Sequence, residues 1–128
     1  MRLNFTVVEG KYGVCRLDKD SRIPDWAYQS VFFSLTKTFD ELSIVCSQES
    51  IPEDIKCERD WKILKVEGIL DFSLTGILAS ISNTLAKAGI SIFAVSTYDT
   101  DYVLVKDMDF KNAIEALKQA GFGVEAAK

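Results

Sequence analysis

Hydrophobic residues in the second half of the chain change their spacing several times, and each change predicts a new element. Residues 61–70 are rich in Ile, Val and Leu with partial alternation, which predicts a strand. Apolar residues then recur at helical spacing between Thr75, a candidate helix cap, and Gly89, a residue suited to a helix end. Residues 90–98 and 102–106 predict two antiparallel strands joined by a polar turn.

A second helix and a last strand complete this half. Asp109 is a candidate cap, Gly121 a candidate end, and residues 122–125 predict a short strand. The order is strand-helix-strand-strand-helix-strand, a ferredoxin-like α+β arrangement in which two helices cover one face of an antiparallel sheet of about four strands. The predicted buried helix residues are Ile77, Leu78, Ile81, Leu85 and Ala88, followed by Phe110, Ala113, Ile114 and Leu117.

The first half follows the same plan with altered pieces. Its predicted elements are a strand at 3–9, a tight turn at 11–13, a return strand at 14–17, a short helix at 24–29 and a hairpin of residues 31–38 and 42–46. Residues 47–60 are polar and too few to hold both a helix and a fourth strand, so we expect the first copy to be truncated. The strand near residues 61–68 either completes the first sheet or couples the two sheets.

The two halves also match locally in sequence. Phe33 recurs as Phe93 within a gapless match of FSLTKTFDELSIV to FAVSTYDTDYVLV, at an offset of 60 positions. The triplet Val-Glu-Gly at 8–10 recurs at 66–68, at an offset of 58. Two matches with nearly one offset predict a duplicated unit of about 60 residues, and units of that size are expected to share a core. The predicted domains are residues 1–60 and 61–128.

Composition narrows the class of protein. Of the 128 residues, 48% are hydrophobic and 27% are charged, as in soluble globular proteins. The sequence contains no apolar run of about 18 residues and no signal-peptide core at its start, so we expect a cytoplasmic protein without a membrane span. The net charge is −4 and the basic residues are scattered, which argues against nucleic-acid binding.

The sequence offers no recognisable catalytic or metal-binding set. It contains no histidine, so the commonest general base is absent. Its three cysteines, Cys15, Cys46 and Cys57, are too few for a four-cysteine zinc site and are interpreted as buried thiols. Asp99 and Asp101 are interpreted as turn residues rather than metal ligands. We expect no catalytic residues, no metal, no cofactor and no enzyme activity.

A family resemblance rests on these residues. The segment DFSLTGILASISNTLAKAGISIFAVSTYDTDYVLVK resembles the loop-helix-strand-strand part of an ACT domain, the small-molecule-sensing module of aspartate kinases and other amino-acid enzymes. The paired motifs FFSLTKTFDELSIV and ISIFAVSTYDTDYVLVK are most similar to tandem ACT proteins of the aspartate kinase-like and CASTOR arginine-sensor branch. The resemblance implies two ferredoxin-like (βαββαβ) ACT units packed together, the first one truncated, and a homodimer.

The resemblance also implies a ligand site at the interface between ACT units. The predicted ligand-binding residues are Asp71, Phe72, Ser73, Leu74, Thr75 and Gly76 in the loop and helix start, with Ile92, Phe93 and Ala94 on the adjacent strand. Independently of the resemblance, a helix start suits a carboxylate, because it offers free backbone N–H groups and the positive end of the helix dipole. The loop departs from the family's Asp-x-Pro-Gly pattern, with no proline and two additional residues. Asp71 could instead cap the loop or helix, and Gly76 could instead serve tight helix–sheet packing.

These features predict a non-catalytic regulatory protein that binds an amino acid or similar small zwitterion. The alternative is a protein-interaction subunit that docks on a partner enzyme and regulates it without binding a ligand itself. An acylphosphatase-like enzyme on the same topology is disfavoured, because residues 71–76 contain no arginine to hold a phosphoryl group.

Overall fold

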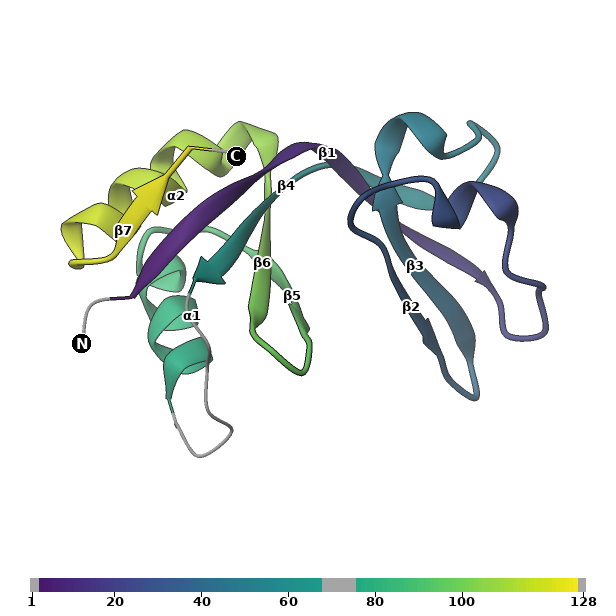
Figure 1. Ribbon diagram of the computed structural model, residues 1–128, viewed down its shortest axis with the longest axis horizontal. Helices are drawn as coiled ribbons and strands as arrows, with labels where there is room; N and C mark the ends of the chain where they lie inside the picture. The colour runs from purple at the N-terminus through teal and green to yellow at the C-terminus, as the bar shows by residue number, and fades with distance from the viewer. Residues whose placement is uncertain (1–2, 68–75, 127–128) are drawn as a thin grey trace. The chain divides into compact units, whose positions relative to one another are not determined.

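The computed structural model describes residues 3–67 and 76–126, which divide into two compact units (Figure 1). The larger unit holds the described residues up to Glu9 and from Lys62 onward, and the smaller unit is Gly10–Trp61. In sequence, the smaller unit is therefore an insertion between two parts of the larger one.

The larger unit has the predicted order of elements. These are β4 (Cys57–Glu67), α1 (Ile77–Lys87), β5 (Ile92–Ser96), β6 (Asp101–Lys106), α2 (Asp107–Gln119) and β7 (Gly123–Glu125). Its sheet has the order β7-β1-β4-β6-β5, where β1 is Asn4–Asp18. The start of β1 runs parallel to β7, with Phe5 opposite Val124. The strand predicted at 3–9 thus belongs to this sheet and not to the first unit, and the sheet has five strands where four were expected.

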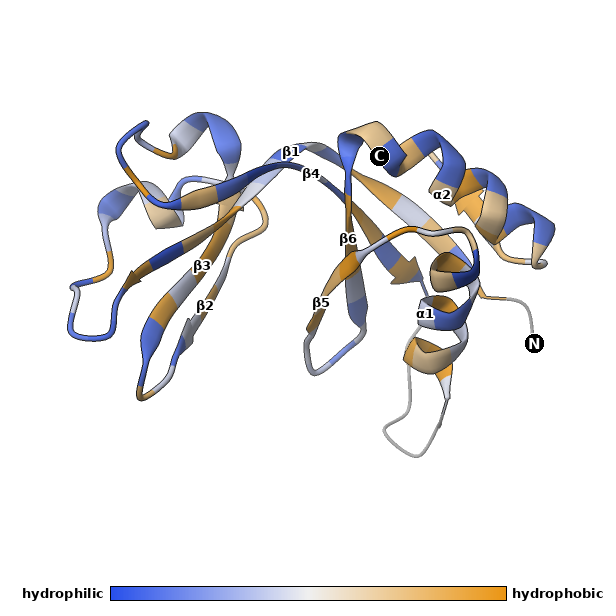
Figure 2. Ribbon diagram, turned by 180° about the vertical axis from the view of Figure 1, so that it is seen from behind, coloured by the Kyte–Doolittle hydropathy of each residue, from blue (hydrophilic) through white to orange (hydrophobic). Residues whose placement is uncertain are grey.

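One face of this sheet carries both helices, and their apolar sides meet it in a single core. Leu64 and Val66 of β4 and Val103 and Val105 of β6 point into that core, because every second residue of a strand faces the same side. Figure 2 shows hydrophobic and hydrophilic segments alternating along both helices. The remaining buried members are Phe5, Ile81, Leu85, Ile90, Ala113, Leu117 and Phe122.

The structure confirms both glycines predicted at the helix ends and corrects the cap predicted for the second helix. Gly89 follows α1 with a φ of +76°, and the Ile90 N–H donates to the Leu85 carbonyl at 3.0 Å, a Schellman-type ending. Gly121 ends α2 in the same way. Asp109 does not cap α2; it lies in the first turn, after Lys106 at the N-cap position. Ala88, predicted to be buried, follows the end of α1 and is exposed.

The smaller unit is built on strands with only short 3₁₀ helices among its residues. Its elements are the second part of β1, a 3₁₀ helix η1 (Asp25–Tyr28), β2 (Ser34–Lys37), β3 (Glu41–Ser47), η2 (Gln48–Ser50) and the first part of β4. The strand order is β2-β3-β1-β4. The predicted short helix and hairpin are confirmed, with shifted boundaries. The core consists of Cys15, Ala27, Leu42, Ile44, Cys46 and Ile51.

The tight turn predicted at residues 11–13 is wrong. β1 runs through these residues as one strand, and Gly13 pairs with Cys46 of β3. Gly13 has a packing role instead, because a Cβ there would lie 2.5 Å from Ile51 Cδ1 and 2.6 Å from Cys57 Sγ. The missing side chain makes room for these two groups.

The two hairpins are equivalent at an offset of 59 positions, not 60. Lys37 is opposite Leu42 in the first hairpin, and Ser96 is opposite Asp101 in the second. At this offset, Ile44 and Cys46 correspond to Val103 and Val105, and all four point into their unit's core. An offset of 60 would exchange the two faces of the strand, because side chains alternate.

The second sequence match does not relate the two units. Val8 and Glu9 lie in the larger unit together with Val66 and Glu67, so they are not equivalent positions of two copies. The turn predicted at residues 99–101 also moves, since Thr97 and Thr100 enclose it and Asp101 opens β6.

Candidate functional site

The predicted ligand-binding residues fall into three groups. Asp71, Phe72, Ser73, Leu74 and Thr75 lie outside the described residues, as does the cap predicted at Thr75. Gly76 occupies the N-cap position of α1. Ile92, Phe93 and Ala94 lie on β5.

Gly76 is explained by its backbone conformation. Its φ is +78°, a region that L side chains rarely adopt. A Cβ at Gly76 would have no described atom within 4 Å, so the alternative of tight helix–sheet packing finds no contact to rest on. The first α-helical bond follows from this residue, with the Ser80 N–H donating to the Gly76 carbonyl at 2.8 Å.

The N-terminus of α1 has a positive electrostatic character that its own side chains do not offset. The N-cap makes no side-chain hydrogen bond, and the first turn contains no acidic residue. By contrast, Asp107 and Asp109 occupy the first turn of α2. Since first-turn amides lack intrahelical partners and the helix dipole is positive there, α1 is the better site for an external carboxylate.

β5 stands at the end of the strand order and pairs with β6, with Phe93 opposite Leu104. Ala94 is exposed and Phe93 is half-buried. Ile92 packs against the core, so its backbone rather than its side chain is available to a ligand. Among the described strands, β5 pairs with β6 alone, so it is an edge strand of this sheet.

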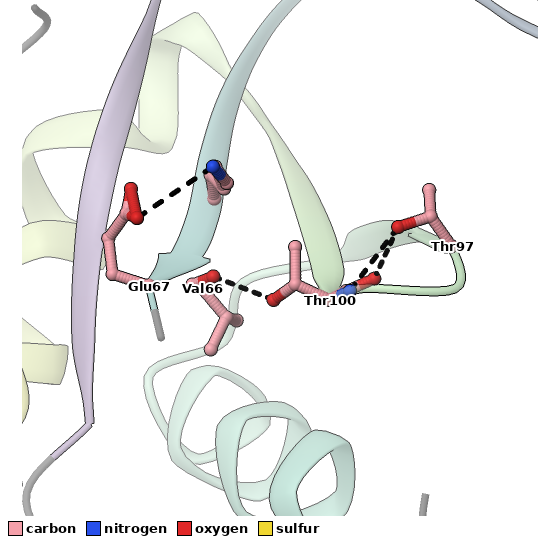
Figure 3. A network of polar contacts seen from close by, with 5 residues as sticks. Val66, Glu67, Thr97 and Thr100 are labelled. Atoms are coloured by element: carbon pink, nitrogen blue, oxygen red, sulfur yellow. Dashed lines mark hydrogen bonds and ion pairs between the residues drawn. The ribbon is translucent and has the colours of Figure 1, made fainter. Parts of the chain in front are cut away.

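A threonine that sequence reasoning missed connects β4 to the turn of the neighbouring hairpin (Figure 3). The buried Thr100 hydroxyl donates to the Val66 carbonyl at 2.6 Å. Within the turn, the Thr97 hydroxyl donates to the Thr100 carbonyl at 3.0 Å. Thr100 therefore holds the last described residues of β4. The signal in the sequence that could have pointed to this contact was the three-residue spacing of Thr97 and Thr100.

The thiols gather in the smaller unit. Cys15 and Cys57 have their sulfur atoms 3.5 Å apart. Contact with the Cys46 thiol and burial raise the pKa of Cys15, and burial raises the pKa of Cys57, so both stay protonated at neutral pH. Residues 3–67 and 76–126 contain no group of three or more Cys, Asp or Glu side chains arranged to hold a metal ion.

Two adjoining surface pockets also lie in the smaller unit, where no site was predicted. The first has a volume of about 490 Å³ and is lined by Lys19, Asp20, Lys37, Thr38 and Phe39. The second, about 470 Å³, shares three of these residues and adds Ser21, Arg22, Ile23, Leu35 and Leu42. The first pocket is open and lined by exposed side chains.

No helix of the described residues is long and apolar enough to cross a membrane.

Comparison with known families agrees with the resemblance in the sequence. A model described as the ACT domain matches residues 56–119, which is half of the chain. The chain therefore belongs to the ACT domain family. A second model, of an N-terminal domain, matches residues 10–54 and nearly coincides with the smaller unit.

Two curated relatives are similar over part of the chain. The human cytosolic arginine sensor for mTORC1 subunit 1 is 29% identical over 99 residues, covering 69% of this chain and 30% of that protein. The human putative protein CASTOR3P is 35% identical over 91 residues, covering 61% of this chain and 56% of that protein. The chain thus spans about 30% of the length of its arginine-sensor relatives.

Solved structures extend the similarity over the whole chain. Protein Atu0741 from Agobacterium tumefaciens is 38% identical with a TM-score of 0.94, and the match covers 100% of this chain and 96% of that one. The regulatory subunit of aspartate kinase from Thermus thermophilus has a TM-score of 0.61 at 12% identity, covering 89% of this chain and 93% of that one. At that identity the likeness concerns the fold.

Proposed function

We propose that this chain is a non-catalytic regulatory protein that binds an amino acid or similar small zwitterion beside the N-terminus of α1. The observation that carries the proposal is the contrast between the two helix starts. Asp107 and Asp109 offset the positive end of α2, whereas the first turn of α1 has no acidic residue. The α1 amides after Gly76 would take the ligand carboxylate.

The edge of β5 would supply the other half of the site. Backbone groups of Ile92, Phe93 and Ala94 on a neighbouring unit would fix the far end of the ligand, together with the predicted loop contacts at 71–75. The position of β5 at the end of the strand order supports this arrangement. A second copy of the chain can present such an edge through a two-fold axis, so we propose a homodimer.

The relatives suggest which ligand to test first. The human relative is named a cytosolic arginine sensor, so arginine heads our candidates and the cytoplasm is the proposed location. We propose a regulated partner enzyme as well, since this ligand-binding role needs an output.

We further propose that the two units are related copies, corresponding to predicted domains 1–60 and 61–128, with a truncated ferredoxin-like plan in the first. The support is the shared hairpin, whose inward positions correspond at an offset of 59. The first part of β1 would then have joined the sheet of the other copy.

A thermal-shift screen against the twenty amino acids and common nucleotides tests the binding proposal. A ligand at about 100 times its Kd should stabilise the protein by ~2.7 kcal/mol, which raises the melting temperature by several degrees. We expect a response to one amino acid or a small group of them. Turnover of an acyl phosphate would contradict the non-catalytic proposal.

The two ends of α1 provide matched variants. Gly76 and Gly89 have φ values of +78° and +76°, and a Cβ on either would have no described atom within 4 Å. Gly76→Ala and Gly89→Ala should therefore lose similar stability, about 1–2 kcal/mol each. Only Gly76→Ala should weaken ligand binding, by about tenfold or more. Equal binding by both variants would contradict the site.

A second candidate function is the docking subunit, favoured by apolar side chains exposed on the smaller unit. Val31 is fully exposed and Tyr28 is about half exposed. The ring of Tyr28 packs edge-to-face against that of Phe33, with 5.7 Å between the ring centroids. Absence of any amino-acid response, together with co-purification of one enzyme, would favour docking. Loss of that co-purification in Val31→Asp would connect it to this surface.

A further inference from the structure

The thiols of the smaller unit come from three neighbouring strands. Cys15 lies on β1, Cys46 on β3 and Cys57 on β4, and all three contribute to the same core. They are 31 and 11 positions apart in sequence, so only the sheet brings them together. All three are free thiols in this structure.

Cys15 and Cys57 stand directly opposite each other. The Arg16 N–H donates to the Lys56 carbonyl at 3.0 Å, and Gly13 lies beside Cys57 and Glu58, so β1 and β4 run antiparallel here. The residue before Arg16 therefore faces the residue after Lys56. Opposed residues of an antiparallel pair have Cα atoms about 4.5–5.5 Å apart, within the range of about 4.4–6.8 Å that a disulfide spans. Their sulfur atoms are 3.5 Å apart.

Cys46 is placed differently. Cys15 pairs with Ile44 and Gly13 pairs with Cys46, so Cys15 and Cys46 are diagonal neighbours. The Cα atoms of diagonal positions are about 7–8 Å apart, which is beyond the ordinary Cα–Cα range of a disulfide. A Cys15–Cys46 bridge would require the backbone to move.

Exposure and space also favour the pair with Cys57. Cys57 is half-buried, whereas Cys15 and Cys46 are buried, so a reagent from solvent reaches Cys57 first. Gly13 leaves the space that Cys57 Sγ occupies, as its own Cβ would lie 2.6 Å from that sulfur.

We propose that Cys15 and Cys57 form a reversible redox pair, in which a small-molecule disulfide oxidises the two thiols to an intramolecular bridge while Cys46 stays free. This modification site is independent of the amino-acid site at α1. The bridge would join β1 to β4, two strands that both continue into the larger unit.

The exchange proceeds in two balanced steps. The Cys57 thiol loses its proton, and its sulfur attacks one sulfur of the small disulfide, which forms a mixed disulfide and releases one small thiol. The Cys15 thiol then loses its proton and attacks the Cys57 sulfur, which forms the Cys15–Cys57 bond and releases the second small thiol. Two protein thiols are oxidised and one small disulfide is reduced.

Thiol trapping in glutathione buffers tests the proposal on the full chain. When unfolded in denaturant with N-ethylmaleimide, the reduced protein should react with three molecules of the reagent, and the protein first equilibrated with oxidised glutathione should react with one. Trypsin should release the peptide of residues 12–16 linked to the peptide of residues 57–59. Dithiothreitol should restore three reactive thiols.

Matched variants separate the pair from the third cysteine. Cys46→Ser should still lose two reactive thiols on oxidation, whereas Cys57→Ser should form no internal bridge. The melting temperature should rise on oxidation in the wild type and in Cys46→Ser only. Three reactive thiols at every glutathione ratio, or a linked peptide containing Cys46, would overturn the proposal, and neither wild-type result depends on how a variant folds.

Discussion

The two hairpins, β2–β3 and β5–β6, use one turn design in two different surroundings. In each, a threonine opens the turn and its hydroxyl contacts the carbonyl three residues later, from Thr38 to Glu41 at 3.4 Å and from Thr97 to Thr100 at 3.0 Å. Both turns carry an exposed aromatic residue at the second position, Phe39 or Tyr98. The turn and the inward-facing strand positions are therefore what the two units share.

The hairpins differ at the fourth turn position. Thr100 is buried and bonds to Val66 of β4, whereas Glu41 begins β3 opposite Asp18 and is partly exposed. Their cores differ too, since the helices supply four of the eleven buried residues of the larger core, while two of the six buried residues of the smaller core are cysteines. The two hairpins thus share their local turn chemistry and differ in their tertiary contacts.

Truncation of equivalent inward positions tests the comparison most strongly. Ile44 and Val103 are fully buried in their respective cores. Ile44→Ala should reduce the free energy of unfolding by about 2–5 kcal/mol. Val103→Ala should cost about 1 kcal/mol less, because it removes one carbon fewer. Urea denaturation measures both, and a cost under 1 kcal/mol at either position would contradict their equivalence.

Filling the space at Gly13 tests the special packing of the smaller core. Gly13→Ala should cost about 1–3 kcal/mol, because its Cβ meets Ile51 and Cys57. The cost should fall when Cys57→Ala is added, since one of the two clashing atoms is then absent. A double-mutant cycle in urea measures this coupling, and purely additive costs would show that Cys57 does not fill the space.

Removing the hydroxyl of Thr100 should reveal the difference between the two hairpins. Thr100→Val leaves the buried Val66 carbonyl without this donor and should cost about 1–2 kcal/mol. Glu41→Gln, at the equivalent position, should change stability by less than about 0.5 kcal/mol. Equal costs would mean that the Thr100 contact contributes nothing specific.

The two turn threonines should behave alike. Thr38→Val and Thr97→Val each remove a hydroxyl that both donates within the turn and accepts backbone N–H groups. Each should cost about 0.5–1 kcal/mol, because both threonines are exposed. Thermal melts at equal protein concentration suffice, and a difference above 1 kcal/mol would break the proposed similarity of the turns.

The sequence predicted the elements best where a long regular hydrophobic pattern ended at a residue such as glycine. The helical spacing up to Gly89 and Gly121 located both helices, because glycine at positive φ ends a helix through backbone bonds alone. The helix starts were harder to predict, since Gly76 and Lys106 make no side-chain capping bond. A residue such as Asp109 then resembles a cap without being one.

Tertiary pairing explains the larger errors. Gly13 suggested a turn because glycine favours turns, but its role is to admit side chains from β4 and the segment before it. The path of β1 through both units depends on distant partners, because its first part pairs with Gly123 to Glu125 of β7 and its second part pairs with β3. The one-residue error in the repeat arose because apolar strands align almost equally well at neighbouring offsets.

The central functional claim is that a ligand binds at the start of α1 and the edge of β5, although the two described pockets lie in the smaller unit. Backbone amide NMR spectra during titration with arginine, and then with any amino acid that shifts the melting temperature, test it most directly. We predict that saturable changes concentrate at residues 76–79 and 92–94. Changes centred on residues 19–23 and 35–42, or no saturable change with any amino acid, would contradict it.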